Sequence, residues 1–190
     1  RLEPDGERIV PRPTSFARKD TGSYYTHDDL VNLLIKETVG PLVEERVAAF
    51  NTQIKKWKSK KELSPAEWKK LDALDPASCI LELRVCDPAM GSGHFLVSLV
   101  DYLADQVLEA MSHGAESVLE QPWAWEAANL WVSPLIARIA DIRDRILASA
   151  KEHGWAVSPE QLDDRHIVRR MILKRVIFGV DLEPELVFWE

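Results

Sequence analysis

The sequence predicts a helix-rich α/β fold built around two parallel strands. Residues 80–86 (ILELRVC) and 175–181 (RVIFGVD) have the short apolar, β-branched composition of buried strands. Most of the remaining sequence shows the apolar spacing of helices. Because two strands with open edges make an incomplete sheet, we expect these 190 residues to be the front part of a longer α/β protein.

The composition is that of an ordinary globular protein, with 46% hydrophobic and 29% charged residues. The net charge of −7 and the isoelectric point near 5.3 argue against a compact basic nucleic-acid module, but they leave a local basic patch open. No apolar run reaches the roughly 18 residues that span a bilayer, and the polar, proline-broken start does not resemble a signal peptide. We therefore expect no contact with a membrane.

Cysteine and histidine usage points to a reducing compartment and to no metal centre. The two cysteines, Cys79 and Cys86, lack CxxC spacing, which excludes a disulfide scaffold and a cysteine-built zinc site. The five histidines form no HxxxH or HExxH pair. We expect a cytoplasmic protein that holds no metal.

The first elements are an arm and a helix. Residues 1–20 are interrupted by three prolines and are expected to form a basic arm or linker, followed by a helical region over 21–78. Thr26 with Asp29 three residues later fits a capping box and predicts the start of the first helix. Gly40-Pro41 should break that helix.

Two further patterns belong to the same helical region. A second helical stretch runs to about Trp57 and ends in residues 55–61, which hold five lysines in seven. We interpret these lysines as a solvated helix end, with contact to DNA phosphates as the alternative. Ser64-Pro65-Ala66-Glu67 combines a cap, a proline at the first helical position and a glutamate at the third, and it predicts a short helix to about Leu74.

Residues 79–190 are expected to be the start of a second domain. After the first strand, a helix is predicted from His94 to about Met111, and residues 112–132 look irregular. This irregular segment holds three tryptophans, for which packing in a core or against a partner domain is favoured over stacking on bases. They are Trp123, Trp125 and Trp131.

The last helices precede the second strand. Ser133-Pro134 predicts the start of one helix, and Gly154 its end. Ser158-Pro159 predicts another, which reaches about Leu173. The extra length over residues 112–170, between the two strands, is expected to be a helical insertion.

The string DPAMGSGHFL at residues 87–96 is the strongest chemical signal, because it lies between a predicted strand and a predicted helix. Gly91 and Gly93 allow tight turns and close approach of a ligand. No Lys-Ser/Thr follows them, which excludes a phosphate-binding P-loop, and Leu96 replaces the third glycine of the dinucleotide motif. The acidic Asp87 suits a ligand with positive charge, such as an ammonium or a sulfonium. A glycine turn by itself is equally compatible with a structural role.

The second signal is Asp181, which follows the second predicted strand. A carboxylate at the end of such a strand can accept hydrogen bonds from both ribose hydroxyls of a nucleotide. The alternative is an ordinary helix cap.

Three blocks together resemble the S-adenosylmethionine-dependent DNA methyltransferases that methylate adenine N6. TGSYYT at residues 21–26 resembles motif X of this family, DPAMGSGHFL at 87–96 resembles motif I, and GVDLEP at 179–184 resembles motif II. Motif X preceding motif I is the γ order, as in single-chain type IIS/IIG restriction–modification proteins. The resemblance implies a partial Rossmann-like methyltransferase fold with a helical insertion.

The resemblance also implies an S-adenosylmethionine site in which each block has one role. The first block would line the methionine end, and the second would wrap the methionine moiety with Asp87 as its acid. In the third block Asp181 would bind the ribose hydroxyls and Leu182 would pack on the adenine. His94 follows the glycine loop and is also expected to contact the cofactor. The full set of expected cofactor-binding residues is Tyr25, Thr26, Asp87, Pro88, Ala89, Gly91, Gly93, His94, Asp181 and Leu182.

Two departures from the family pattern are visible. His27 stands where the family usually has proline, which bears on how the first helix begins, and Asp181 follows Asp87 by 94 residues, more than a simple βαβ unit needs. The catalytic NPPY-type motif of the family does not occur in the 190 residues. We therefore expect it beyond Glu190 and assign no catalytic residue here.

The expected function is the cofactor-binding part of a DNA adenine-N6 methyltransferase of a restriction–modification or phage-defence system. The expected partners are double-stranded DNA, bound by the full-length protein, and other domains of the same chain. Two alternatives remain open. One is a methyltransferase that acts on RNA, protein or a small molecule, and the other is a non-catalytic helical specificity or scaffold module.

Overall fold

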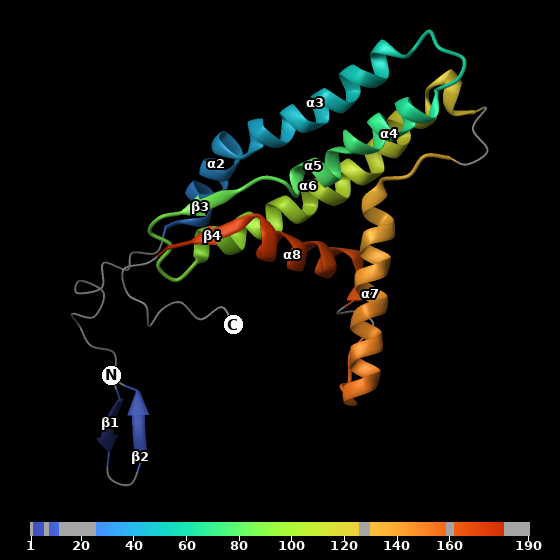
Figure 1. The fold of residues 1–190 in the computed structure, drawn as a ribbon. Coiled ribbons are helices and arrows are strands. Elements are labelled where there is room, and N and C mark those ends of the chain that lie inside the picture. The colour runs from blue at the N-terminus through green and yellow to red at the C-terminus, as the bar shows by residue number, and fades with distance from the viewer. Residues whose placement is uncertain (1, 6–7, 12–25, 126–129, 159–161, 181–190) are drawn as a thin grey trace.

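The computed structural model of the chain describes residues 2–5, 8–11, 26–125, 130–158 and 162–180 (Figure 1). Helices predominate within these residues. The helices are α2 (Asp28–Thr38), α3 (Gly40–Lys56), α4 (Pro65–Ala73), α5 (Pro76–Ile80), α6 (His94–Leu119), the 3-10 helix η1 (Pro122–Ala124), α7 (Pro134–His153) and α8 (Asp164–Arg175). The strands are β1 (Leu2–Asp5), β2 (Arg8–Pro11), β3 (Val85–Asp87) and β4 (Ile177–Gly179).

The described strands form two pairs. β3 and β4 are parallel neighbours, with Val85 opposite Ile177 and Asp87 opposite Gly179. This confirms the expected pairing of two segments that lie about ninety residues apart in the sequence. β1 and β2 form an antiparallel pair. The expected arm therefore contains a hairpin that its prolines did not suggest.

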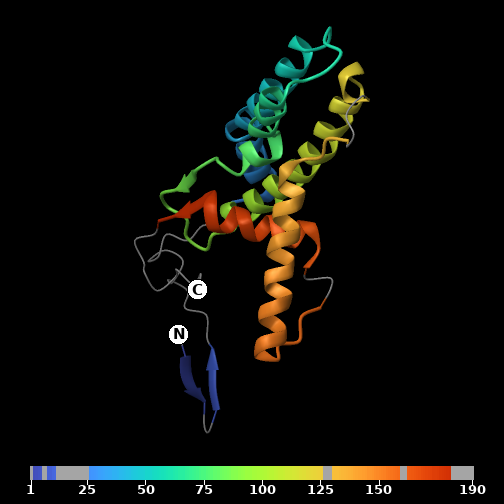
Figure 2. The same cartoon turned by 45° about the vertical axis from the view of Figure 1, so that its right-hand side comes forward.

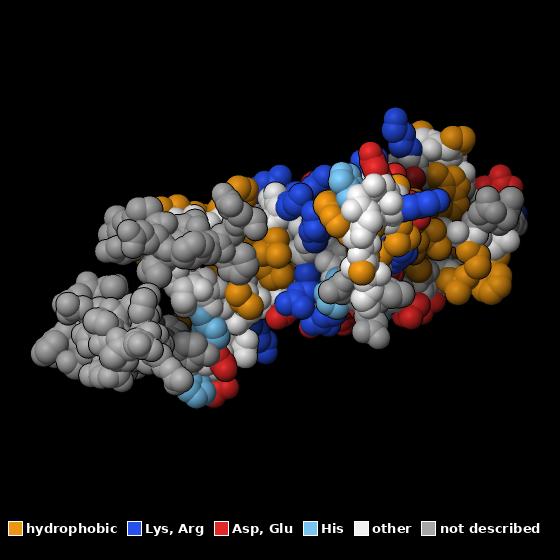
Figure 3. Space-filling model, turned by 90° about the horizontal axis from the view of Figure 1, so that it is seen from below, with side chains coloured by type: hydrophobic (Ala, Val, Ile, Leu, Met, Phe, Trp, Pro, Cys, Tyr) orange, Lys and Arg blue, Asp and Glu red, His pale blue; other side chains and the backbone are white. Residues whose placement is uncertain are grey.

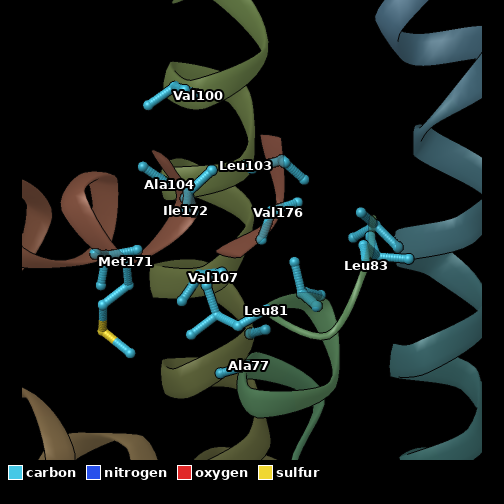
Figure 4. Packing of buried hydrophobic residues seen from close by; sticks show 14 of the residues in the cluster. Ala77, Leu81, Leu83, Val100, Leu103, Ala104, Val107, Met171, Ile172 and Val176 are labelled. Carbon is cyan, nitrogen blue, oxygen red and sulfur yellow. The ribbon is translucent and has the colours of Figure 1, made fainter. Parts of the chain in front are cut away.

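Helix α6 organises the main core (Figures 1 and 2). Leu99, Leu103 and Val107 follow helical spacing along it and are fully buried. Figure 4 shows Leu103 and Val107 in the same packed cluster as Ala77 from α5 and Ile172 from α8, which are also fully buried. Because α5 leads into β3 and α8 leads into β4, this packing positions both strands beside the start of α6.

A second, aromatic core joins the far end of α6 to α3 and α4. Trp123 is buried and its ring meets Trp68 edge-on at a centroid distance of 5.5 Å. Trp131 packs on Phe50 at 5.3 Å. Core packing is thus confirmed for two of the three tryptophans of this segment, whereas Trp125 is 71% exposed.

The capping box predicted for α4 is confirmed. Ser64 Oγ accepts a hydrogen bond from the Glu67 N–H, and the Glu67 carboxylate accepts one from the Ser64 N–H. Lys60 also binds this carboxylate. The hydrogen bond that Lys60 donates to the carboxylate, followed by those from the Ser64 N–H and the Ser64 hydroxyl, lowers the pKa of Glu67 to about 2. Because the folded-state pKa is depressed, the stabilisation that this carboxylate gives is complete above its ordinary pKa of 4.5 and is lost as the pH falls toward 2.

The start of α7 is attached to α5 by a buried polar cluster. Asp75 caps α5 and accepts hydrogen bonds from Ser78 Oγ at 2.6 Å and from Ser133 Oγ at 2.9 Å. Ser133 in turn caps α7 by accepting a hydrogen bond from the Leu135 N–H. The predicted end of α7 at Gly154 is also confirmed, since Gly154 adopts a left-handed conformation with φ of 68°.

Ion pairs attach α8 to α6. Arg169 binds Asp101 at 2.9 Å, and Arg165, one turn earlier in α8, binds Asp105, one turn later in α6. Lysine and arginine side chains gather over α7 and α8 in the view of Figure 3. Arg165 and Arg169 are paired with carboxylates of α6. The gathering of basic side chains therefore does not by itself indicate a nucleic-acid surface.

The helix start predicted at Thr26 was one residue early, whereas the one predicted at Ser158-Pro159 falls on residues 159–161, which lie outside the described residues. α2 begins at Asp28, and its cap is His27, whose Nδ1 accepts a hydrogen bond from the Asp29 N–H at 3.2 Å. His27 in place of proline therefore provides a cap for the helix. Among the described residues, α8 begins at Asp164 and is capped by Asp163.

The predicted strand at residues 80–86 was also placed too early. Asp75 caps a short helix, α5, through Ile80, and the strand starts only at Val85. The cap and the proline that follows it outweigh the β-like composition of this segment.

α6 runs to Leu119 rather than to about Met111, which shortens the irregular segment. None of the described helices is long and apolar enough to cross a membrane.

Candidate cofactor site

The glycine loop leaves the same edge of the sheet as the end of β4. The Val180 N–H donates to the Asp87 carbonyl at 2.9 Å, and the Met90 N–H donates to the Val180 carbonyl at 3.0 Å. The parallel pairing thus continues past the ends of both strands. It holds the loop beside the residue that immediately precedes Asp181. Such an edge, at the carboxyl ends of parallel strands, is where open α/β sheets bind ligands.

The loop has a conformation that its glycines make possible. Gly91 and Gly93 have positive φ of 52° and 74°. The Gly93 N–H donates to the Met90 carbonyl at 2.8 Å, which closes the turn. Asp87 Oδ1 accepts a hydrogen bond from the Ala89 N–H at 3.0 Å, so the acid shapes its own loop. Pro88 and Ala89 lie exposed at the tip.

The start of α6 faces this loop without a side chain at its cap. Gly93 is the N-cap residue, and no side chain accepts a hydrogen bond there. The first N–H groups of a helix have no partner within the helix and carry the positive end of its dipole. A Cβ built on Gly91 would meet no atom of the described residues within 4 Å. The positive end of the α6 dipole at this loop suits a polar or anionic ligand group.

Gly179 lets the loop pack onto β4. A Cβ at this position would lie 2.0 Å from Met90 Sδ and 3.0 Å from Leu96 Cδ1. Met90 and Leu96 are both buried, which fixes the glycine loop and the first turn of α6 against the strand. Neither Gly179 nor Met90 was among the residues expected at the site. The only signal for them was their place within the motif II and motif I blocks.

Replacing Gly179 by alanine should therefore displace Met90 and lower the free energy of unfolding by about 1–3 kcal/mol, as overpacking does. Urea denaturation measures this. Gly40→Ala is the control, because its Cβ would meet Tyr102 Oη at an ordinary 3.5 Å. On a Met90→Ala background the Gly179→Ala penalty should fall to less than half. An unchanged urea midpoint for Gly179→Ala would show that the loop does not pack as described.

The structure also brings the start of α2 to the loop. His94 Nε2, at the first position of α6, lies 2.9 Å from Asp28 Oδ1, at the first position of α2. Thr26 lies two residues before Asp28 and is exposed. The end of the motif X-like block is thereby connected to the motif I-like loop. Asp28 was not predicted, and it becomes visible only through this contact.

Four groups of expected site residues have different outcomes. Asp87, Gly91, Gly93 and His94 lie together around the loop described above. Pro88 and Ala89 form its exposed tip. Thr26 lies next to the start of α2. The remaining three lie outside the described residues: Tyr25, Asp181 and Leu182.

Within the described part of the chain, no group of three or more His, Cys, Asp or Glu side chains could hold a metal ion.

A groove of about 480 Å³ lies elsewhere, between α3 and the second half of α6. Its lining includes Glu44, Glu109, Glu116 and Glu120. Four carboxylates would repel DNA phosphates, and the groove does not include the glycine loop. The groove is therefore separate from the candidate cofactor site at the loop.

The chain is similar to a protein of Methanocaldococcus jannaschii whose name describes it as a type II restriction enzyme and methyltransferase. The two are 28% identical over an alignment of 199 positions, which covers 96% of this chain and 16% of that protein. The chain thus spans about one sixth of the length of this relative. No family model matches the chain. No solved structure matches it either.

Proposed function

We propose that this chain forms the S-adenosylmethionine-binding part of a DNA methyltransferase of a restriction–modification system, acting on adenine N6. The observation that carries the proposal is the common edge at which β3 and β4 end. It brings the loop after Asp87 beside the residue before Asp181, as a shared nucleoside-containing ligand requires. The relative from Methanocaldococcus jannaschii, whose name includes both restriction and methylation, supports the same class.

The residues around the loop fit this cofactor. The Asp87 carboxylate at the end of β3 complements a positively charged ligand group. The positive end of the α6 dipole, which no side chain caps, complements a carboxylate, such as that of the methionine moiety. When bound, S-adenosylmethionine supplies an electrophilic methyl group on its sulfonium. In this proposal the residues of the chain bind and orient that cofactor, with Asp181 accepting hydrogen bonds from the ribose.

The proposal extends to the fold and to the partners. The strand–loop–helix unit of β3, the loop and α6 would be the first unit of a Rossmann-like sheet, to which β4 adds the second strand. DNA would be bound by the complete protein. Its target adenine would have to leave the base stack, because the amino nitrogen cannot be reached within the duplex.

Calorimetric titration of the chain with S-adenosylmethionine tests the proposal. We expect saturable but weak binding, because the part of the chain that the structure describes provides only two strands of this sheet. S-adenosylhomocysteine should compete for the same site. ATP and NAD should not compete, because the loop lacks both phosphate-binding patterns. Absence of binding by S-adenosylmethionine, or equal competition by ATP, would refute the assignment.

A further inference from the structure

The contact between Asp28 and His94 joins two helix starts that lie 66 residues apart in the sequence. Each residue is the first of its helix, α2 or α6. His94 directly follows Gly93, the last residue of the glycine loop. A contact that fixes the His94 imidazole therefore also constrains the junction between the glycine loop and α6.

The two acids at the start of α2 have different roles. The Asp29 N–H donates to His27 Nδ1, and the Asp29 carboxylate lies 3.4 Å from the same nitrogen. Asp29 thus serves the cap of its own helix and its side chain is 91% exposed. Asp28 instead reaches across to α6, where the side chain of His94 is only 27% exposed.

Apolar packing alone would leave the two helices free to slide at this end. Val31 and Ile35 of α2 are buried in the same cluster as Leu99 of α6. Such contacts depend on buried area and have no fixed direction. A hydrogen bond constrains both distance and angle. The Asp28–His94 contact therefore sets the position of the start of α2 relative to the loop.

We infer that Asp28 is a positioning residue for the cofactor site, which acts through His94 to hold the start of α2, with Thr26 two residues before it, at a fixed place beside the glycine loop. This inference rests on the proposed function, in which Thr26 and the loop contact the same S-adenosylmethionine. A site held in its bound arrangement loses less conformational freedom when the ligand enters. Loss of the contact should therefore weaken binding and loosen the loop even without ligand.

Three variants test the inference, namely Asp28→Ala, Asp28→Asn and Asp29→Ala. Asp28→Ala should raise the dissociation constant for S-adenosylmethionine about three- to tenfold in calorimetry, in the range that one partly exposed charged hydrogen bond contributes. Asp28→Asn keeps an oxygen that can accept from His94 and should recover at least half of the loss on a logarithmic scale. Asp29→Ala should leave the dissociation constant unchanged, although it removes a carboxylate from the same helix turn.

Hydrogen–deuterium exchange of the ligand-free chain provides a second measurement. Asp28→Ala should speed exchange over residues 88–96, whereas Asp29→Ala should not. His94→Ala should have the same effect as Asp28→Ala, and the double variant should add nothing further. Equal dissociation constants or equal loop exchange for Asp28→Ala and Asp29→Ala would overturn the inference. A parent chain that shows no binding of S-adenosylmethionine would instead refute the proposed function, and the exchange result would still decide whether Asp28 holds the loop.

Discussion

Asp181→Ala should weaken the binding of S-adenosylmethionine at least about a hundredfold. In the proposed site the Asp181 carboxylate accepts hydrogen bonds from both ribose hydroxyls. Each hydrogen bond to a charged group contributes about 1.5–3 kcal/mol, and about 1.4 kcal/mol corresponds to a factor of ten. The structural reason for expecting this role lies in the preceding residue, Val180. Its N–H donates to the Asp87 carbonyl and its carbonyl accepts from the Met90 N–H, so it is hydrogen-bonded to the glycine loop through both backbone groups. Calorimetry of the variant and the parent measures the difference.

Two further variants separate the ribose role from a general effect of charge. Glu183→Ala removes a carboxylate only two residues away in the sequence and should leave the affinity within about twofold, because the proposed site gives the ribose contact to Asp181 alone and a charge without a direct ligand contact contributes little. Asp181→Asn keeps one acceptor oxygen and should lie between the parent and Asp181→Ala. If Asp181→Ala bound as tightly as the parent, Asp181 would be a helix cap, which is the alternative that the sequence leaves open.

Local signals in the sequence predicted most of the helix boundaries. The cap at Ser64 and the stop at Gly154 follow from side-chain and backbone preferences of a few adjacent residues, and both were predicted correctly. The strand at residues 80–86 was not, because two local signals compete there. ILEL has the composition of a strand, but Asp75-Pro76 favours a helix, and burial of Ile80 against α6 decides in favour of the helix.

The candidate site was predictable to the extent that its chemistry is local. The glycine loop and its Asp87 form one contiguous string, and the resemblance identified them without any structure. Asp28 and Gly179 could not be identified in this way. Asp28 matters through a residue 66 positions away. Gly179 is needed because the parallel pairing places it against the Met90 side chain, where a Cβ would not fit. Both roles are properties of the packed chain, which residue spacing does not encode.

The 190-residue chain alone should transfer no methyl group to DNA. Its sequence contains no Asn/Asp-Pro-Pro-aromatic string, and this motif holds the extruded adenine in the family that the chain resembles. The complete protein, in our proposal, supplies that motif together with further strands of the sheet. The assay is transfer of tritiated methyl groups from S-adenosylmethionine to double-stranded DNA. We expect background counts with the chain, and label at adenine N6 with the complete protein.

The size of this expected loss follows from what cofactor binding cannot provide. Extruding a base costs a few kcal/mol, which contacts in a base pocket must offset. Alignment of the adenine nitrogen with the methyl group contributes up to about 7–11 kcal/mol of barrier lowering, and it needs groups that hold both partners. In the proposed site the described residues would position only the cofactor. Label on RNA or protein but not on DNA would favour the other methyltransferase classes. Clear transfer to DNA by the 190-residue chain would mean that it contains a base-binding site of its own. The proposal that this chain supplies only the cofactor site would then be wrong.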